Sequence, residues 1–155
     1  MPFLAFKFLH ILTMFSAVAA AVIPEVVYQS FARRRNLAAL RAMAPAVEVA
    51  GKLIPPLFIL GLAFGLVAAF TGSLNFLAPW LIAAYVVFLI AMVTGAAFSG
   101  PWTQRVARAA SASDGVTPSA DLEAALADPR GLIASTILMA SIVAIIFLMV
   151  VKPLS

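Results

Sequence analysis

Four long apolar runs, separated by short polar or glycine-containing breaks, dominate the chain. They cover residues of about 3–32, 45–71, 76–99 and 129–152. An α-helix needs about 20 apolar residues to cross the roughly 30 Å hydrocarbon core of a bilayer, and each run meets that length. The pattern therefore predicts an all-α fold, a four-transmembrane-helix antiparallel bundle that makes residues 1–155 a single membrane domain.

The breaks predict how the helices end and connect. Three arginines, residues 33–35, follow the first run, and Gly100-Pro101 follows the third. Thr71-Gly72-Ser73 ends the second run and begins a short uncharged link, which predicts that the second and third helices form a hairpin. Asp128-Pro129 is typical of the cap and first position of a helix, and Lys152-Pro153 ends the last run.

The segment of residues 103–128 has a different composition, with serine, alanine and acidic residues in place of the large apolar ones. Thr117 before Pro118 is typical of a helix N-cap and first helical position. Leu122 and Leu126 are four residues apart and share one helix face. We predict a short helix here, between the third and fourth spans, lying on the membrane surface.

Composition excludes a water-soluble core, because 65% of the residues are hydrophobic, 10% are charged and the mean hydropathy is +1.12. The net charge of +4 comes mainly from arginines near the loops of residues 33–44 and 103–128, and basic loops stay in the cytoplasm. Both termini are therefore expected outside, and we interpret the basic character as a topology signal, not as nucleic-acid binding. The expected inner residues are Arg33, Arg34, Arg35, Arg41, Lys52, Arg105, Arg108 and Arg130, against Lys7 and Lys152 outside.

His10 is the only histidine and the chain has no cysteine, so His10 is the one strong candidate ligand for a transition metal besides the carboxylates. Counted from the outer boundary, Tyr85 on the third helix and Met149 on the fourth lie at a similar depth. The first hypothesis is a b-type haem with His10 as one axial ligand and Met149, an open position or a second His10 from a symmetric partner as the other. The second and favoured hypothesis is that His10 only packs and hydrogen-bonds between helices.

Glu25 follows Pro24 near the inner end of the first helix, at a depth where an acidic residue is usually paired or functional. Lys52 on the second helix lies at a similar depth, so we predict an ion pair of Glu25 with Lys52, with Arg33 or Arg34 as competitors. A proton relay or quinone site at Glu25 is the alternative. The hydroxyls within the runs, Ser135 among them, are expected to join helices by hydrogen bonds.

Gly61 and Gly65 form a small-xxx-small ridge on the second helix, beyond Pro55-Pro56. Such a ridge allows a neighbouring helix to approach closely.

Catalytic patterns are missing from the sequence. It contains no nucleophile elbow, glycine-rich phosphate loop, HExxH motif or paired intramembrane carboxylates. A stand-alone transporter is also disfavoured, because the spans are short and none forms a broken-helix pair. We therefore expect a protein that is not an enzyme.

Several short motifs carry a resemblance. Lys7-Phe8-Leu9-His10-Ile11-Leu12 opens the first helix, Pro79-Trp80-Leu81 opens the third, Gly100-Pro101 closes it, and the stretch of residues 147–153 ends the chain. Over nearly its whole length the chain resembles a family of bacterial four-helix integral membrane proteins, domain of unknown function 2269. The resemblance implies this fold and a place in the bacterial cytoplasmic (inner) membrane.

Leu9-His10 is also similar to the first helix of the copper-resistance D proteins and of the haem-binding, protoporphyrinogen-oxidising membrane proteins. Those bundles use further histidines on other helices, and this chain has none.

The leading functional expectation is a non-catalytic integral membrane subunit or accessory protein of a larger membrane complex, with a respiratory or photosynthetic electron-transfer assembly as its expected context. Its partners would be the lipid bilayer and other membrane subunits or further copies of the chain, and no nucleic acid. The alternative is a redox or haem b protein that uses His10. A weaker alternative is a small proton-coupled transporter that uses Glu25.

Overall fold

The computed structural model describes residues 2–113 and 117–153, and it is helical almost throughout. The α-helices are α1 (Pro2–Arg33), α2 (Leu37–Thr71), α3 (Pro79–Thr94), α4 (Gly100–Ala112), α5 (Ala120–Ala127) and α6 (Pro129–Val151). A π-helical segment, Gly95–Ser99, joins α3 to α4, so that Pro79–Ala112 forms one continuous rod. Four of the helical rods are long and apolar enough to cross a membrane, which confirms the predicted all-α, multi-pass class.

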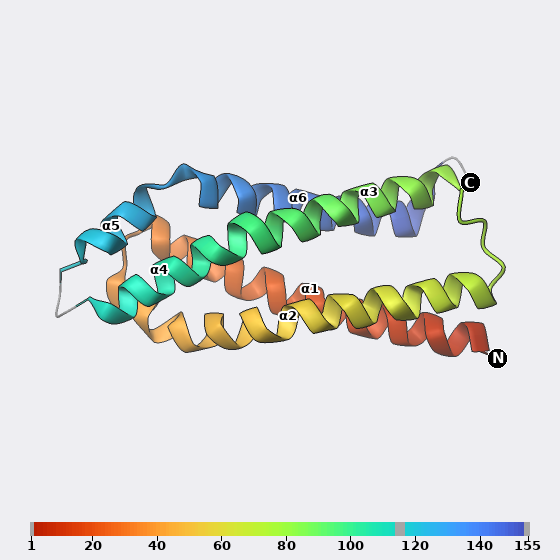
Figure 1. Ribbon diagram of the computed structural model, residues 1–155, viewed down its shortest axis with the longest axis horizontal. Coiled ribbons are helices and arrows are strands. Elements are labelled where there is room, and N and C mark those ends of the chain that lie inside the picture. The colour runs from red at the N-terminus through yellow and green to blue at the C-terminus, as the bar shows by residue number, and fades with distance from the viewer. Residues whose placement is uncertain (1, 114–116, 154–155) are drawn as a thin grey trace.

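The rods lie roughly along one axis and alternate in direction (Figure 1). Both chain termini lie at one end of the bundle, which we call the terminal end. The α1–α2 turn, the last turns of α4 and the whole of α5 lie at the other end, where most of the arginines are concentrated, and we call it the arginine end. Together these positions give the antiparallel order that the sequence predicts.

The predicted bounds of the first and fourth spans hold within one residue. The second helix begins eight residues earlier than the predicted residue 45, since Asn36 caps it through a 3.1 Å hydrogen bond from Ala39 N to Asn36 Oδ1. Pro45 lies inside this helix and does not start it. The third helix starts at Pro79, not at residue 76, because Ala78 is its N-cap and the proline takes the first helical position.

The predicted end of the third helix, near residue 99, is wrong. The rod continues through Gly100-Pro101 to Ala112, and Ser99 at this junction belongs to the π-helix. Proline has no N–H and its ring collides with the carbonyl four residues back, which in an ordinary α-helix would be that of Ala97. The wider π turn, in which Gly100 N bonds to Gly95 O, accommodates the proline without ending the helix.

The predicted short helix before the fourth span is present as α5, but its cap differs from the predicted one. Ser119, not Thr117, caps α5, with its hydroxyl accepting from Leu122 N. Leu122 is completely buried, and α4, which fills the first part of the predicted surface segment, buries Val106 and Ala110 completely. Both short helices are therefore part of the core at the arginine end.

The buried core itself is concentrated at that end. Tyr28 and Leu40 from the α1–α2 turn region pack there with Trp102 and Val106 of α4 and with Leu122 of α5. Toward the terminal end the arrangement changes: α1 packs along α2 and α3 packs along α6. The predicted hairpin of the second and third helices is antiparallel but loosely packed, since α2 meets α3 through an edge-to-face contact of Phe58 with Phe88 and does not pack along it. The two helix pairs are joined mainly by α2 against α4, with a short contact between α1 and α6.

A glycine decides how closely α6 approaches α4. A Cβ added at Gly131 would overlap the ring of Trp102, which is 2% exposed and donates a 3.0 Å hydrogen bond from Nε1 to Ala125 O. The ring is held on several sides and has no free space to move into. The absence of a side chain at Gly131 is therefore what allows α6 to start against this tryptophan.

We predict that Gly131→Ala destabilises the protein by about 1–3 kcal/mol, the usual cost of overpacking a filled site. The matched control is Gly95→Ala, where the added Cβ would be 3.8 Å from Leu138, an ordinary contact. The measurement is equilibrium unfolding in mixed detergent micelles. Equal stabilities for the two variants would contradict this account of the Trp102 packing.

Candidate functional site

Glu25 is a buried carboxylate in the last third of α1, toward the arginine end, with an exposed fraction of 9%. Its Oε1 atom accepts hydrogen bonds from Ser99 Oγ at 3.1 Å, from Gln29 Nε2 at 3.0 Å and from Ser135 Oγ. Its Oε2 atom accepts a hydrogen bond from Thr103 Oγ1 at 3.2 Å. Three hydroxyls and one amide thus converge on a single carboxyl group, and we call these five side chains the Glu25 cluster.

The cluster is assembled from three rods that are far apart in sequence. Glu25 and Gln29 are one turn apart on α1, Ser135 lies on α6, and Ser99 and Thr103 lie on either side of the π-to-α junction. Ser99 and Ser135 are almost completely buried and also lie 3.2 Å apart, oxygen to oxygen. The wider π turn just before Pro101 sets where Ser99 and Thr103 fall around the rod, and π turns recur at functional sites.

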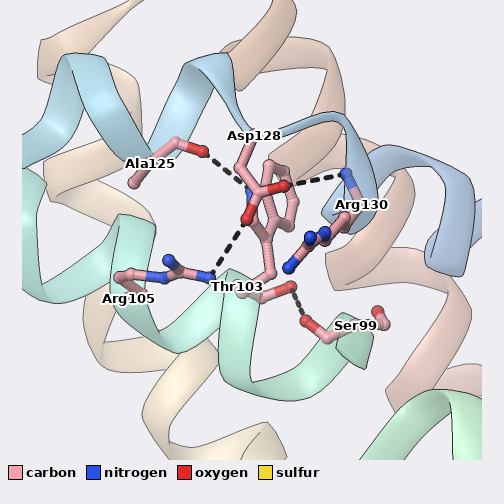
Figure 2. A network of polar contacts seen from close by, with 7 residues as sticks. Ser99, Thr103, Arg105, Ala125, Asp128 and Arg130 are labelled. Carbon is pink, nitrogen blue, oxygen red and sulfur yellow. Dashed lines mark hydrogen bonds and ion pairs between the residues drawn. The ribbon is translucent and has the colours of Figure 1, made fainter. Parts of the chain in front are cut away.

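A network beside the cluster fixes the position of α4 (Figure 2). Asp128 caps α6 by accepting from Arg130 N at 3.0 Å, and it forms an ion pair with Arg105 of α4 at 3.4 Å. Thr103 Oγ1 lies 2.9 Å from the carbonyl oxygen of Ser99, one turn back on the same rod. These contacts hold the start of α6 and the rod that carries Ser99 and Thr103 in one arrangement.

A small, half-open cavity of about 70 Å³ lies beside Glu25, between α1, α2 and α4. Glu25, Thr103 and Gln104 supply its polar groups, and Pro24, Gly51 and Gly100 are among its apolar lining. A water molecule needs about 10–15 Å³ of such space and polar partners, and this cavity offers both.

The structure does not bring Glu25 and Lys52 together. Lys52 Nζ lies 2.7 Å from Glu48 Oε1, one turn back on the same helix, and both side chains are exposed. Within the described residues, the ion pairs join Lys52 to Glu48, Arg35 to Glu123 and Arg105 to Asp128. Glu48 and Lys52 are one turn apart on α2, so their charges pair within that helix. Glu25 faces the interior and accepts hydrogen bonds from hydroxyl groups there.

His10 lies between α1 and α2. Its Nδ1 donates to the carbonyl oxygen of Gly61 at 2.7 Å, and a Cβ added at Gly65 would lie 2.7 Å from the same nitrogen. A Cβ added at Gly61 would overlap Met14, one turn along from His10. The Gly61-Gly65 ridge therefore does what the sequence predicts, since it lets α1 approach closely.

The haem hypothesis needs a second ligand near His10. Tyr85 lies on α3 and Met149 on α6, so both belong to the other helix pair, and α1 does not pack along α3. The hydrogen bond of His10 goes to α2, and within the described residues none joins it to Tyr85 or Met149. The described residues also contain no group of three or more His, Cys, Asp or Glu side chains that would hold a metal ion. The haem hypothesis stays a prediction.

The sequence identifies Glu25 as a candidate functional residue but does not identify most of its hydrogen-bond partners. Ser99 and Thr103 belong to no recognisable motif, and the sequence predicts for Ser135 only a hydrogen bond between helices. The available signal was approximate depth: each hydroxyl lies within a few turns of the arginine end of its helix, as Glu25 does, and a lone membrane carboxylate needs donors. Which helices face each other could not be known from depth alone.

Comparisons with protein-family models, with curated proteins and with solved structures found no match.

We predict that Ser135→Ala destabilises the protein by about 1.5–3 kcal/mol, because it removes a hydrogen bond to a buried charged group. Ser141→Ala is the matched control, since Ser141 is also buried on α6 but its hydroxyl bonds only to the Ile137 carbonyl of its own helix. Unfolding in mixed micelles gives both values. A Ser141→Ala protein as unstable as the Ser135→Ala protein would contradict the assignment of Ser135 to the Glu25 cluster.

Proposed function

We propose that the protein is a non-catalytic integral membrane subunit that packs against a partner's transmembrane helix within a larger complex. The observation that carries the proposal is the division of the bundle into two helix pairs. The pairs share a core at the arginine end, but beyond it α3 meets α2 through the edge-to-face contact of Phe58 with Phe88 and does not pack along α1 or α2. A closed four-helix bundle would bring each helix against two neighbours along its whole length.

The open part lies toward the terminal end, and we call the space between the α1–α2 pair and the α3–α6 pair the seam. In α1, the first buried residue is Ala17, so the fifteen preceding helical residues, 2–16, contribute none to the core. Lipid chains fill such a surface in an isolated protein. A partner helix fills it with better packing, and packing is the main force between helices within a membrane.

The proposal includes a location, which is the cytoplasmic membrane of a bacterium with the arginine end inside. Support comes from the clustering of the arginines at one end and of both termini at the other. Basic loops are retained on the cytoplasmic side. The proposed context is an electron-transfer complex, and its support is the set of glycine ridges for helix packing together with the near absence of catalytic groups.

The partner can be located with a photo-crosslinking amino acid. We predict that the crosslinker at Leu62, on α2 one turn beyond the Phe58–Phe88 contact, captures a membrane partner in the native membrane. The control is the crosslinker at Val49, on the opposite side of α2 in the arginine half, which should capture far less. Val49 is the more exposed of the two, at 56% against 37%, so lipid contact alone would favour the control.

Equal capture at both positions, or a protein that leaves its native membrane only as a monomer, would contradict the proposed subunit role. A Soret absorption band in such a monomer that His10→Ala abolished would favour the haem hypothesis instead.

The orientation can be tested because the natural chain has no cysteine. Asn36 lies in the turn between α1 and α2 at the arginine end, and Asn75 lies in the link between α2 and α3 at the terminal end. We predict that a membrane-impermeant maleimide labels Asn75→Cys in cells whose cytoplasmic membrane is intact, and labels Asn36→Cys only after permeabilisation. The reverse pattern would show that the arginine end faces outward.

A further inference from the structure

The two oxygens of the Glu25 carboxyl group have different surroundings. Oε1 accepts from Ser99, Gln29 and Ser135, so its acceptor sites are filled. Oε2 accepts only from Thr103 Oγ1. A carboxylate has about four acceptor sites, two on each oxygen, so Oε2 keeps one free.

The Thr103 hydroxyl has one hydrogen and two acceptors within reach. Glu25 Oε2 lies at 3.2 Å, and the Ser99 carbonyl oxygen lies at 2.9 Å. A carbonyl oxygen has two lone pairs, so it accepts a hydroxyl even when it also serves the helix. Rotation about one side-chain bond therefore turns Thr103 from a donor to Glu25 into an acceptor from Glu25.

The cavity lies on the same side of the carboxyl group. Glu25 and Thr103 both line it, whereas Ser99 and Ser135, the two buried hydroxyl donors to Oε1, do not. Water in the cavity would thus reach the side of Glu25 that has a free acceptor site. The buried side stays closed by the two serines.

We propose that Glu25 Oε2 is a proton-binding site that exchanges its proton with water in this cavity. On binding, a hydronium ion in the cavity gives its proton to Oε2, an O–H bond forms, and a water molecule remains. The carboxylate becomes a neutral acid that donates to Thr103 Oγ1, while the Thr103 hydrogen moves to the Ser99 carbonyl oxygen. Every polar group keeps a partner in both states, which is the condition for both to be accessible in a buried site.

Among the described residues that line the cavity, Glu25 is the only one with a charged side chain, so no other lining residue competes with it for the proton. On the packed helices, Lys52 of α2 pairs with Glu48 and Arg105 of α4 pairs with Asp128. Arg108 donates to Gln104, which lines the cavity, but Arg108 itself does not line it. Arg130 of α6 lies five residues before Ser135 and is not among the cavity residues, and Tyr28 of α1 is buried in the core. The site is independent of the proposed subunit role.

The test is infrared difference spectroscopy of the full chain in lipid nanodiscs, between acidic and alkaline buffer. We expect a carbonyl band of a protonated carboxylic acid that disappears in Glu25→Gln. The same band should persist in Glu48→Gln, which removes an exposed carboxylate from the neighbouring helix.

A second pair of variants keeps Glu25 and tests its acceptor. In Thr103→Val the protonated acid loses the oxygen to which it donates, so the Glu25 band should shift to higher frequency. Thr103→Ser restores the hydroxyl and should return the band to its original position. This pair remains informative if Glu25→Gln fails to fold.

Three outcomes would overturn the proposal. The first is a difference spectrum that Glu25→Gln leaves unchanged in a monodisperse protein. The second is a Glu25 band that Thr103→Val does not move. The third is displacement of the band by Na⁺ at constant pH, which would make the cluster an alkali-metal site.

Discussion

A carboxylate that faces the interior of a membrane bundle must find hydrogen-bond donors, and the way Glu25 meets this requirement links the parts of the molecule. Its donors come from α1 itself, from the junction of the π-helix with α4, and from α6. The α1–α2 pair and the α3–α6 pair otherwise meet mainly through α2 and α4. The Glu25 cluster is therefore the polar contact that joins α1 to the second pair, and a charged group left without it would cost several kcal/mol.

Small residues determine the rest of the packing. Gly61 and Gly65 receive Met14 and His10, so α1 and α2 approach closely over much of their length, and Gly131 receives Trp102 where α6 begins. These contacts hold each pair together and close the arginine end. Among the described residues, the edge-to-face contact of Phe58 with Phe88 crosses the seam, and no glycine contact of this kind does. The protein thus combines a firmly packed end with an end whose apolar surface is open to lipid or to a partner helix.

The two proposals concern different parts of this arrangement. The subunit role rests on the seam, and the proton site rests on the unequal surroundings of the two Glu25 oxygens. The cluster lies close to the closed core, where its hydroxyl partners are held by the Asp128 network (Figure 2). A protonatable group so placed is insulated from whatever covers the seam, and each proposal stands or falls by its own experiment.

The pattern of apolar runs by itself determined the class of fold, the number of spans, the ends of the first and last helices and the close approach at Gly61 and Gly65. Each of these follows from residues close together in the sequence, as do the helix caps at Asp128 and Lys152. The tertiary structure alone decided that the third helix passes through Pro101, that α5 packs Leu122 into the core, and that Glu25 binds Ser99, Thr103 and Ser135 in place of Lys52. The reason is that a sequence specifies depth along each helix, whereas the rotation of each helix and the choice of its neighbour come from packing between segments. Lys52 and the hydroxyls have similar depth, but only the hydroxyls face inward.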